Sequence, residues 1–199
     1  MKNPQAETTP YHHGNLRRAL IDATLAMISE EGLKSISIRE VAKRAGVSHG
    51  APYRHFKEKG ELLCAVAIEG FDMVIADTRK RFEKYPDTLS RFRESGLAYI
   101  DFAVSFPSHY RVMFSSVDLT HSTDLEKRSN EAFMILYNCI CDCQEKNLVR
   151  PGDPFEFAMA AWAIVHGYSM LIIDGFISEP SDRLKHVITD SLYFGLRFE

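Results

Sequence analysis

The sequence predicts an all-α fold of about nine helices. It contains no sustained alternation of polar and apolar residues flanked by hairpin turns, which is the signal of β-strands. Helical periodicity is common instead. Leu16, Leu20, Ala23 and Met27 are spaced by four, three and four residues, which places them on one face of a helix that Gly32 ends. Apolar residues make up 45% of the 199-residue chain and charged residues 26%, as in a globular protein with a packed core.

A second and a third helix are predicted from capping signals. Ser37 and Glu40 form a capping-box pattern that opens a short helix. Gly46 ends this helix, because glycine readily adopts a positive φ. Ser48 is the N-cap expected for the next helix. Residues 37–56 therefore predict a helix, a glycine turn and a helix, which is the helix-turn-helix layout.

The remaining helices are bounded by proline and by further caps. Pro86 and Pro107 interrupt the helical pattern, and residues 123–126 form a second capping box. Asp153 is a predicted N-cap, with Pro154 at the first helical position. The predicted helices span residues 58–85, 88–105, 108–115, 123–147, 154–177 and 181–198.

Charge divides the chain into a basic head and an acidic body. Residues 1–60 contain ten Lys and Arg against six Asp and Glu, a net charge of +4, whereas residues 61–199 contain 14 against 21, a net charge of −7. This asymmetry favours an anionic partner for the head alone, although a chance imbalance would look the same. We expect a domain at 1–60, with 1–12 as a flexible arm, and a second domain at 61–199.

The composition argues against secreted and membrane proteins. The first 15 residues lack the apolar region of a signal peptide. Residues 157–173 are the most lipid-like stretch but fall short of a spanning length, so we expect a buried core or subunit-interface helix there. Four unevenly spaced cysteines do not resemble a disulfide framework, which indicates a reducing, cytoplasmic setting. They are Cys64, Cys139, Cys141 and Cys143.

Residues 46–63, GVSHGAPYRHFKEKGELL, have the residue types of a segment that reads DNA. A helix in the major groove, about 12 Å wide, needs small side chains or side chains that reach base edges. Gly50 and Ala51 allow close approach, the Ala51 methyl group can contact a thymine methyl group, and His49 can donate or accept a hydrogen bond. Pro52 costs little in a first turn, where backbone N–H groups are mostly unpaired.

Side chains that can bind phosphate follow these base-edge candidates. Tyr53, Arg54 and His55 can reach phosphate oxygens. Lys57 and Lys59 stand where the next helix begins, and the free N–H groups there also attract phosphate. The alternative is a short, solvated basic helix with caps. The phosphate candidates are Ser48, Tyr53, Arg54, His55, Lys57 and Lys59.

This region resembles the TetR family of bacterial transcriptional regulators. The matching runs are IREVA at 38–42, AGVS at 45–48, YRHF at 53–56 and KEKGELL at 57–63. The resemblance implies an N-terminal DNA-binding domain of three helices and a larger helical domain that dimerises and binds a small ligand. It also implies that Arg39 is a polar DNA contact from the second helix.

The resemblance assigns roles to other residues of the same run. His49, Gly50 and Ala51 match base-facing positions, and Tyr53, His55 and Lys59 match phosphate contacts. The implied core residues are Val41, Ala42, Val47 and Phe56. The chain departs from the family at Pro52, where many members have Leu, and at Gly60, where many have an acid, and both departures bear on local helix geometry.

A weaker resemblance to the branch with a WHG type of C-terminal domain covers Tyr11–Arg17, 107–114 and Trp162, His166 and Gly167. His12 and His13 could instead be the remnant of a tag or metal site. Trp162 and His166 share a helix face, so they could line a ligand cavity with His166 as its polar anchor, or form a core pair. Gly167 would allow close approach of a neighbouring helix. The ligand-pocket candidates, each of which could also be plain core, are Tyr110, Met113, Phe114, Phe133, Tyr137, Trp162, His166 and Met170.

Three cysteines cluster at positions 139, 141 and 143. Cys139 and Cys143 share a helix face and Cys141 points away, so three ligands to one metal would need a partner element. We read them as small buried apolar side chains, with thiol or metal sensing as the alternative. No hydrolase, metalloprotease, P-loop or dinucleotide motif is present, so we expect no enzyme, cofactor, catalytic residue or metal.

The sequence therefore predicts a dimeric transcriptional repressor that a small-molecule effector releases from a palindromic operator. The resemblance implies that the last two helices, 154–177 and 181–198, form the dimer interface. The expected partners are double-stranded operator DNA, a second copy and the effector, with no membrane. The rival from another class is an all-α ligand carrier or enzyme with an incidental basic head.

Overall fold

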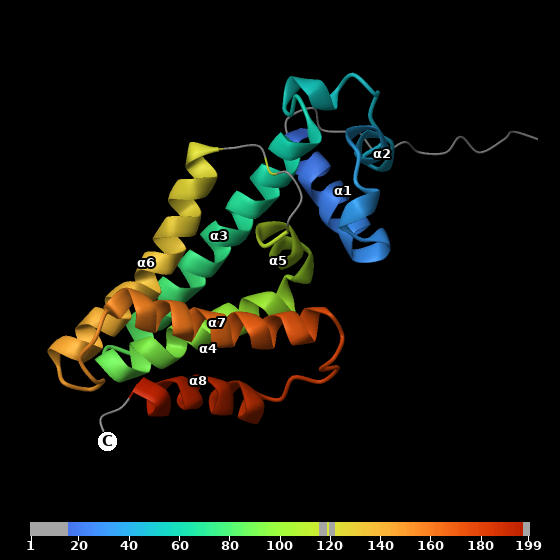
Figure 1. Ribbon diagram of the computed structural model, residues 1–199. Coiled ribbons are helices and arrows are strands. Elements are labelled where there is room, and N and C mark those ends of the chain that lie inside the picture. The colour runs from blue at the N-terminus through green and yellow to red at the C-terminus, as the bar shows by residue number, and fades with distance from the viewer. Residues whose placement is uncertain (1–15, 116–118, 120–121, 197–199) are drawn as a thin grey trace, which may run out of the picture. The chain divides into compact units, whose positions relative to one another are not determined.

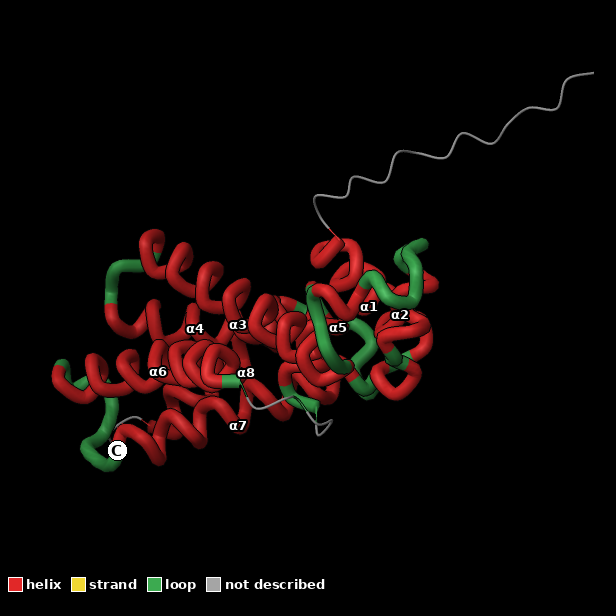
Figure 2. Tube along the Cα trace, turned by 90° about the horizontal axis from the view of Figure 1, so that it is seen from above, coloured by secondary structure: helices red, strands yellow, loops and turns green. Residues whose placement is uncertain are grey.

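The computed structural model describes residues 16–115, 119 and 122–196, and the prediction of an all-α fold is confirmed. The described part contains eight α-helices, which Figure 1 draws as coiled ribbons, and the colouring of Figure 2 shows helices and loops there without strands. Two short 3₁₀ turns add to them, η2 (Leu33–Ser35) and η3 (Pro52–Arg54). The α-helices are α1 (Leu16–Glu31), α2 (Ile38–Arg44), α3 (Lys59–Lys84), α4 (Thr88–Ser105), α5 (Pro107–Met113), α6 (Thr123–Glu145), α7 (Pro154–Ile173) and α8 (Asp182–Leu196).

The chain divides into two compact units. The N-terminal unit comprises residues 1–62 and the C-terminal unit residues 63–199. In the N-terminal unit, α1 packs against α2 and both 3₁₀ turns. Its buried apolar side chains include Leu20, Val41 and Phe56. The predicted arm at 1–12 lies outside the described residues.

Most helix ends lie where the local signals place them. The Ser37 hydroxyl oxygen accepts the Glu40 backbone N–H at 3.2 Å, and α2 begins at the next residue after Ser37. The Asp153 carboxylate likewise accepts the Phe155 N–H at 2.9 Å at the start of α7. The predicted cap at Thr123 was displaced by one residue, because the Ser122 hydroxyl oxygen accepts the Leu125 N–H at 3.4 Å, in the first turn of α6.

The prediction of a third α-helix after Gly46 was wrong, because this segment forms a short 3₁₀ turn. No α-helix begins at Ser48, and the segment contains only η3. The Ala51 N–H donates to the Ser48 carbonyl at 3.0 Å, which is a 3₁₀-type bond. The next donor in a helix would be the N–H of Pro52, which proline lacks, so the helical ladder is broken where it would begin. A single α-type bond then closes, from the Phe56 N–H to the Pro52 carbonyl at 2.9 Å.

The C-terminal unit has a core formed by four helices. α4, α6, α7 and α8 pack against one another in all pairs except α6 with α8, and α5 packs against α4. Ile100, Ile140, Val149 and Ala158 are among the fully buried side chains of this core. α7 ends at Ile173, earlier than the predicted 177, because Asp174 caps it and Gly175 turns the chain with a φ of +80°.

Helix α7 passes a length and composition test for a membrane span, with a mean hydropathy of 1.4 and 39% of the tested window buried. It is the one helix of the described residues to do so. Because α7 packs against α4, α6 and α8, the apolar residues on the side that faces these helices form part of the core.

Candidate functional site

The segment predicted to read DNA is exposed in the N-terminal unit. Tyr53 has 56% of its surface exposed, and Lys59 is half-buried at the start of α3. The implied core residues Val41, Ala42 and Phe56 are buried. Val47 is only half-buried, which corrects its assignment to the core. The exposed candidates are Arg39, Ser48, His49, Gly50, Tyr53, Arg54, His55 and Lys57, with Ala51 half-buried.

Two buried side chains hold this exposed segment in place. Gly46, with a φ of +68°, turns the chain out of α2, and the Val47 N–H returns to the Ala42 carbonyl at 3.0 Å. Pro52 and Phe56 are both buried, and the polar residues between and before them point outward. The segment is therefore a short loop with one 3₁₀ turn, anchored at its middle and its end.

Gly50 is not required by the fold of this unit. Its φ lies outside the positive range, and a Cβ built there would meet no atom within 4 Å among the described residues. Neither backbone conformation nor packing therefore explains a glycine at this position. The upstream run that includes His12 and His13 lies outside the described residues, apart from its last two positions in α1.

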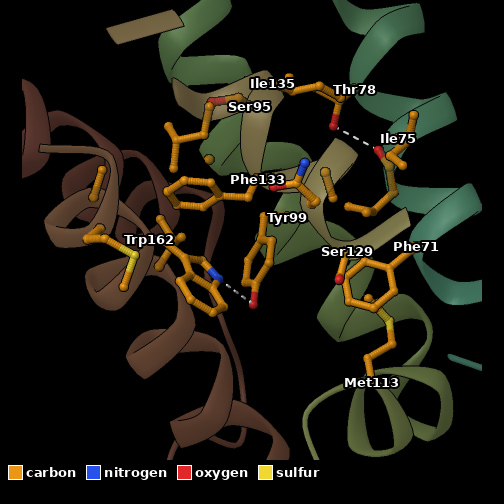
Figure 3. A pocket seen from close by; sticks show the side chains of 18 of the residues that line it. Phe71, Ile75, Thr78, Ser95, Tyr99, Met113, Ser129, Phe133, Ile135 and Trp162 are labelled. Carbon is orange, nitrogen blue, oxygen red and sulfur yellow. Dashed lines mark hydrogen bonds between the residues drawn. The ribbon is translucent and has the colours of Figure 1, made fainter. Parts of the chain in front are cut away.

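A cavity of about 380 Å³ lies inside the C-terminal unit. Figure 3 shows Tyr99 and Trp162 side by side in its wall, joined by a hydrogen bond, with Phe71, Phe133 and Met113 among the other lining residues. Four of the eight predicted pocket residues line it, namely Met113, Phe114, Phe133 and Trp162. Walls that the sequence reasoning missed come mainly from α3, α4 and α6 and include Phe71, Val74, Ile75, Phe92, Tyr99 and Leu136.

His166 does not line the cavity, which corrects its predicted role as a polar anchor. Its Nδ1 atom lies 2.8 Å from both the Tyr99 and the Tyr110 hydroxyl groups, which are 3.1 Å apart. The Trp162 indole N–H donates to the Tyr99 hydroxyl oxygen at 3.1 Å. Burial lowers the pKa of His166, which favours the neutral ring that can accept a phenolic proton.

The four residues Tyr99, Tyr110, Trp162 and His166 are called here the Tyr–His cluster. It joins α4, α5 and α7 directly behind the cavity wall. Burial raises the pKa of Tyr110 to about 12, so both phenols keep their protons for hydrogen bonding. The cluster therefore fixes the wall residues Tyr99 and Trp162 rather than offering free polar groups to a ligand.

Three further pocket candidates do not line the cavity. Tyr110 is buried in the Tyr–His cluster, and Tyr137 and Met170 are partly exposed. A Cβ on Gly167 would meet nothing within 4 Å, so no described helix approaches it closely. Close approaches occur at other glycines, such as Gly96, where an added Cβ would lie 3.0 Å from a Thr189 methyl carbon.

Two of the three clustered cysteines have the character of core, and Cys141 is half-buried. Cys139 and Cys143 are buried, and burial raises the pKa of their thiols to about 12 and about 11. Such thiols are almost fully protonated at neutral pH and therefore react slowly. Among the described residues no group of three His, Cys, Asp or Glu could hold a metal ion. Thiol or metal sensing is therefore not favoured.

Comparisons with known proteins agree with this geometry. Residues 20–66 match the model described as "Bacterial regulatory proteins, tetR family", and residues 92–192 match "Tetracyclin repressor-like, C-terminal domain". The transcriptional regulator AcrR of Shigella flexneri is 35% identical over 91 residues, which are 45% of this chain and 42% of that protein. The nucleoid occlusion factor SlmA of Vibrio cholerae is 25% identical over 71% of this chain and 72% of its own.

Solved structures share the fold over nearly the whole chain. A protein of unknown function from Rhodococcus sp. RHA1 is 27% identical with a TM-score of 0.82, covering 96% of this chain and all of its own. AibR, solved in complex with isovaleryl coenzyme A and operator DNA, is 18% identical with a TM-score of 0.70, covering 90% and 97%. The family models together cover both units, and one of them spans half of the chain. The chain belongs to the TetR family of transcriptional regulators.

Proposed function

We propose that this protein is a cytoplasmic, dimeric repressor whose N-terminal unit binds a palindromic operator and whose cavity binds the small molecule that releases it. The observation that carries the proposal is the pairing of two features in one chain. One unit exposes a basic segment anchored by the buried Pro52 and Phe56, and the other contains a partly open apolar cavity of about 380 Å³. This volume lies within the range of small-molecule sites in proteins.

The N-terminal unit supplies groups of both kinds that a DNA-binding surface needs. His49, Gly50 and Ala51 are the proposed base contacts, and Arg39 adds a polar contact from α2. The proposed phosphate contacts are Ser48, Tyr53, Arg54, His55, Lys57 and Lys59. Lys59 is the first residue of α3, where free backbone N–H groups also favour a phosphate.

Replacing Lys59 by alanine is expected to weaken binding to all DNA sequences. The loss of one phosphate contact per protomer reduces the slope of log K against log salt by about one for each protomer. Fluorescence anisotropy of labelled DNA over a salt series measures this slope. The matched control is Lys127→Ala, which removes an exposed lysine of α6 from the other unit. An unchanged slope for Lys59→Ala would remove Lys59 from the interface.

A stripe of small and apolar residues on α7 supports the dimer. Ala160, Ala163, Ile164, Gly167 and Leu171 follow helical spacing and are all exposed. Ile164 and Leu171 have 44% and 45% of their surface exposed, which is unusual for such residues on one face. The open space at Gly167 would let a helix of a second copy approach closely.

The last helix extends this apolar surface. Leu184 and Val187 of α8 are exposed, as is Ser191 one turn further on. We assign this set of α7 and α8 residues, the α7–α8 stripe, to contact with its symmetry mate in a second copy. A two-fold dimer would present two copies of residues 46–63, the reading segment, to the two halves of a palindromic operator.

Release would follow from a shift between two states of the dimer. Walls of the cavity come from α3 to α8, and α7 carries both Trp162 on the cavity side and the α7–α8 stripe on another. A ligand that binds one arrangement of these helices more tightly would populate it. A difference in affinity of a few kcal/mol between the two states is sufficient for this coupling.

A further inference from the structure

The cavity contains no charge to receive an ionised ligand. Its 22 lining residues include no Asp, Glu, Lys, Arg or His. Seven are aromatic, and most of the others are aliphatic or methionine. A carboxylate, phosphate or ammonium group would lose its hydration on entry without gaining a partner, which is strongly unfavourable.

The charged side chains beside the α6 wall are already paired. Glu131, which follows the lining residue Asn130 on α6, accepts from Arg79 at 2.7 Å and from Arg128 at 2.9 Å. Arg128 also lies 2.9 Å from the Asp72 carboxylate. A ligand carboxylate that took either arginine would have to break an existing ion pair.

The serine and threonine hydroxyl groups of the walls already donate their hydrogen bonds to backbone carbonyls. Thr78 donates to the Val74 carbonyl at 2.8 Å, and Ser95 donates to the Phe92 carbonyl at 2.7 Å. Ser129 and Thr189 likewise donate to carbonyls of their own helices. Because a hydroxyl has one proton and two lone pairs, these groups can now only accept a hydrogen bond.

The other polar groups of the wall are also engaged. Trp162 gives its N–H to Tyr99, as Figure 3 shows, and the Tyr99 hydroxyl group is held in the Tyr–His cluster. Asn130 has an amide that can donate as well as accept, and it stands at an exposed position beside Ser129. The wall is therefore rich in acceptors and offers one amide as a donor.

The volume sets a lower bound on the size of the ligand. A water-sized group occupies about 30 Å³ in a liquid, so about 380 Å³ has room for at least roughly a dozen such groups. We infer that the effector is an uncharged, largely apolar molecule of about a dozen or more non-hydrogen atoms that carries a hydrogen-bond donor such as a hydroxyl group. The role of this ligand as an effector rests on the proposed function, whereas the preference of the cavity for such a ligand does not.

The experiment uses Trp162, the one tryptophan of the chain, as the reporter. Its fluorescence is followed in the full-length protein during titration with 1-decanol, decanoate, decylammonium or the ether methyl nonyl ether, all of similar size. We expect saturable binding of 1-decanol that is at least about tenfold tighter than that of either charged probe. It should also be about threefold to tenfold tighter than that of the ether, which lacks the donor.

Two variants in which phenylalanine replaces an alanine show whether the fluorescence signal comes from the cavity. Ala132→Phe fills part of the cavity and should abolish the response to 1-decanol. Ala76→Phe adds the same group on an exposed position of α3 that does not line the cavity, and should leave the response intact. A response that survives Ala132→Phe would place binding elsewhere and overturn the inference.

Each other outcome is equally decisive. Decanoate or decylammonium binding as tightly as 1-decanol overturns the assignment of an uncharged ligand, and an ether that binds as tightly overturns the donor. Binding of none of the probes overturns the assigned class and size. Because no DNA is present, these results are independent of operator binding, so a protein that selects 1-decanol but binds no DNA would contradict only the proposed function.

Discussion

Ile164→Glu is expected to convert the dimer into monomers and to weaken operator binding by at least about a hundredfold. Ile164 lies in the middle of the α7–α8 stripe, and its side chain is 44% exposed in the single chain. In a two-fold interface each substitution occurs twice, so two carboxylates would be buried close together without partners. A monomer would bind only half of the operator and lose the gain from simultaneous binding of both halves.

The matched control is Val104→Glu, which introduces the same carboxylate at an exposed apolar position of α4 outside the stripe. Sedimentation equilibrium gives the mass of each variant, and a gel shift gives its operator affinity. The control should remain dimeric with near wild-type affinity. An Ile164→Glu protein that is still dimeric would show that the two copies meet on a different surface.

His166→Ala is expected to lower the free energy of unfolding by about 2–4 kcal/mol. The substitution removes the acceptor shared by the Tyr99 and Tyr110 hydroxyl groups, and leaves one phenolic proton without a partner in a buried region. It also removes ring contacts with Tyr110 and Phe114, whose centroids lie 5.7 Å and 4.8 Å from that of the imidazole. Urea unfolding followed by circular dichroism measures the change.

His186→Ala serves as the control, because His186 is an exposed residue of α8. Its effect should stay within about 0.5 kcal/mol. A His166→Ala protein as stable as this control would show that the Tyr–His cluster contributes nothing to the packing of α4, α5 and α7.

The same histidine should give the wild-type protein a pH-dependent stability. Burial lowers the folded-state pKa of His166, so below the ordinary value of about 6.5 the unfolded chain binds more protons than the folded one. The stability contributed by the neutral ring is present above pH 6.5 and is lost as the pH falls toward the lowered pKa. His166→Ala should reduce this slope, whereas His186→Ala should keep it.

The helix boundaries could be predicted because their signals are local. Ser37 and Asp153 cap helices with their own side chains, and Gly46 ends α2 with a positive φ. Such bonds involve residues two to four apart, so the sequence displays them directly. The displaced cap at Ser122 shows the limit, because a serine next to a threonine offers two hydroxyl groups for one position.

The position of the reading segment could be predicted from the sequence, but its conformation could not. Its exposed polar residues and buried Phe56 follow from the pattern, whereas the 3₁₀ turn results from one missing N–H at Pro52 within a run that otherwise favours a helix. Whether the remaining bonds are sufficient for an α-helix depends on the packing of Pro52 and Phe56, which spacing does not reveal.

The cavity could be predicted only in part, for a physical reason. Helical periodicity identifies the faces that turn inward, such as Phe71, Val74 and Ile75 on α3, but it does not distinguish a packed core from an enclosed space. Trp162 and His166 share a face, yet one lines the cavity and the other lies behind it. That difference is set by Tyr99, which is distant in sequence and was not a candidate.

Selection of genomic DNA fragments by the full-length protein tests the central claim most directly. The protein is mixed with sheared DNA from its own organism at moderate salt, and the bound fragments are sequenced. We predict strong enrichment of an inverted repeat with two matching half-sites about one helical turn apart or a multiple of it, which Ile164→Glu no longer retains. A dimer that enriches no sequence would contradict DNA-binding regulation and leave a ligand carrier as the better account.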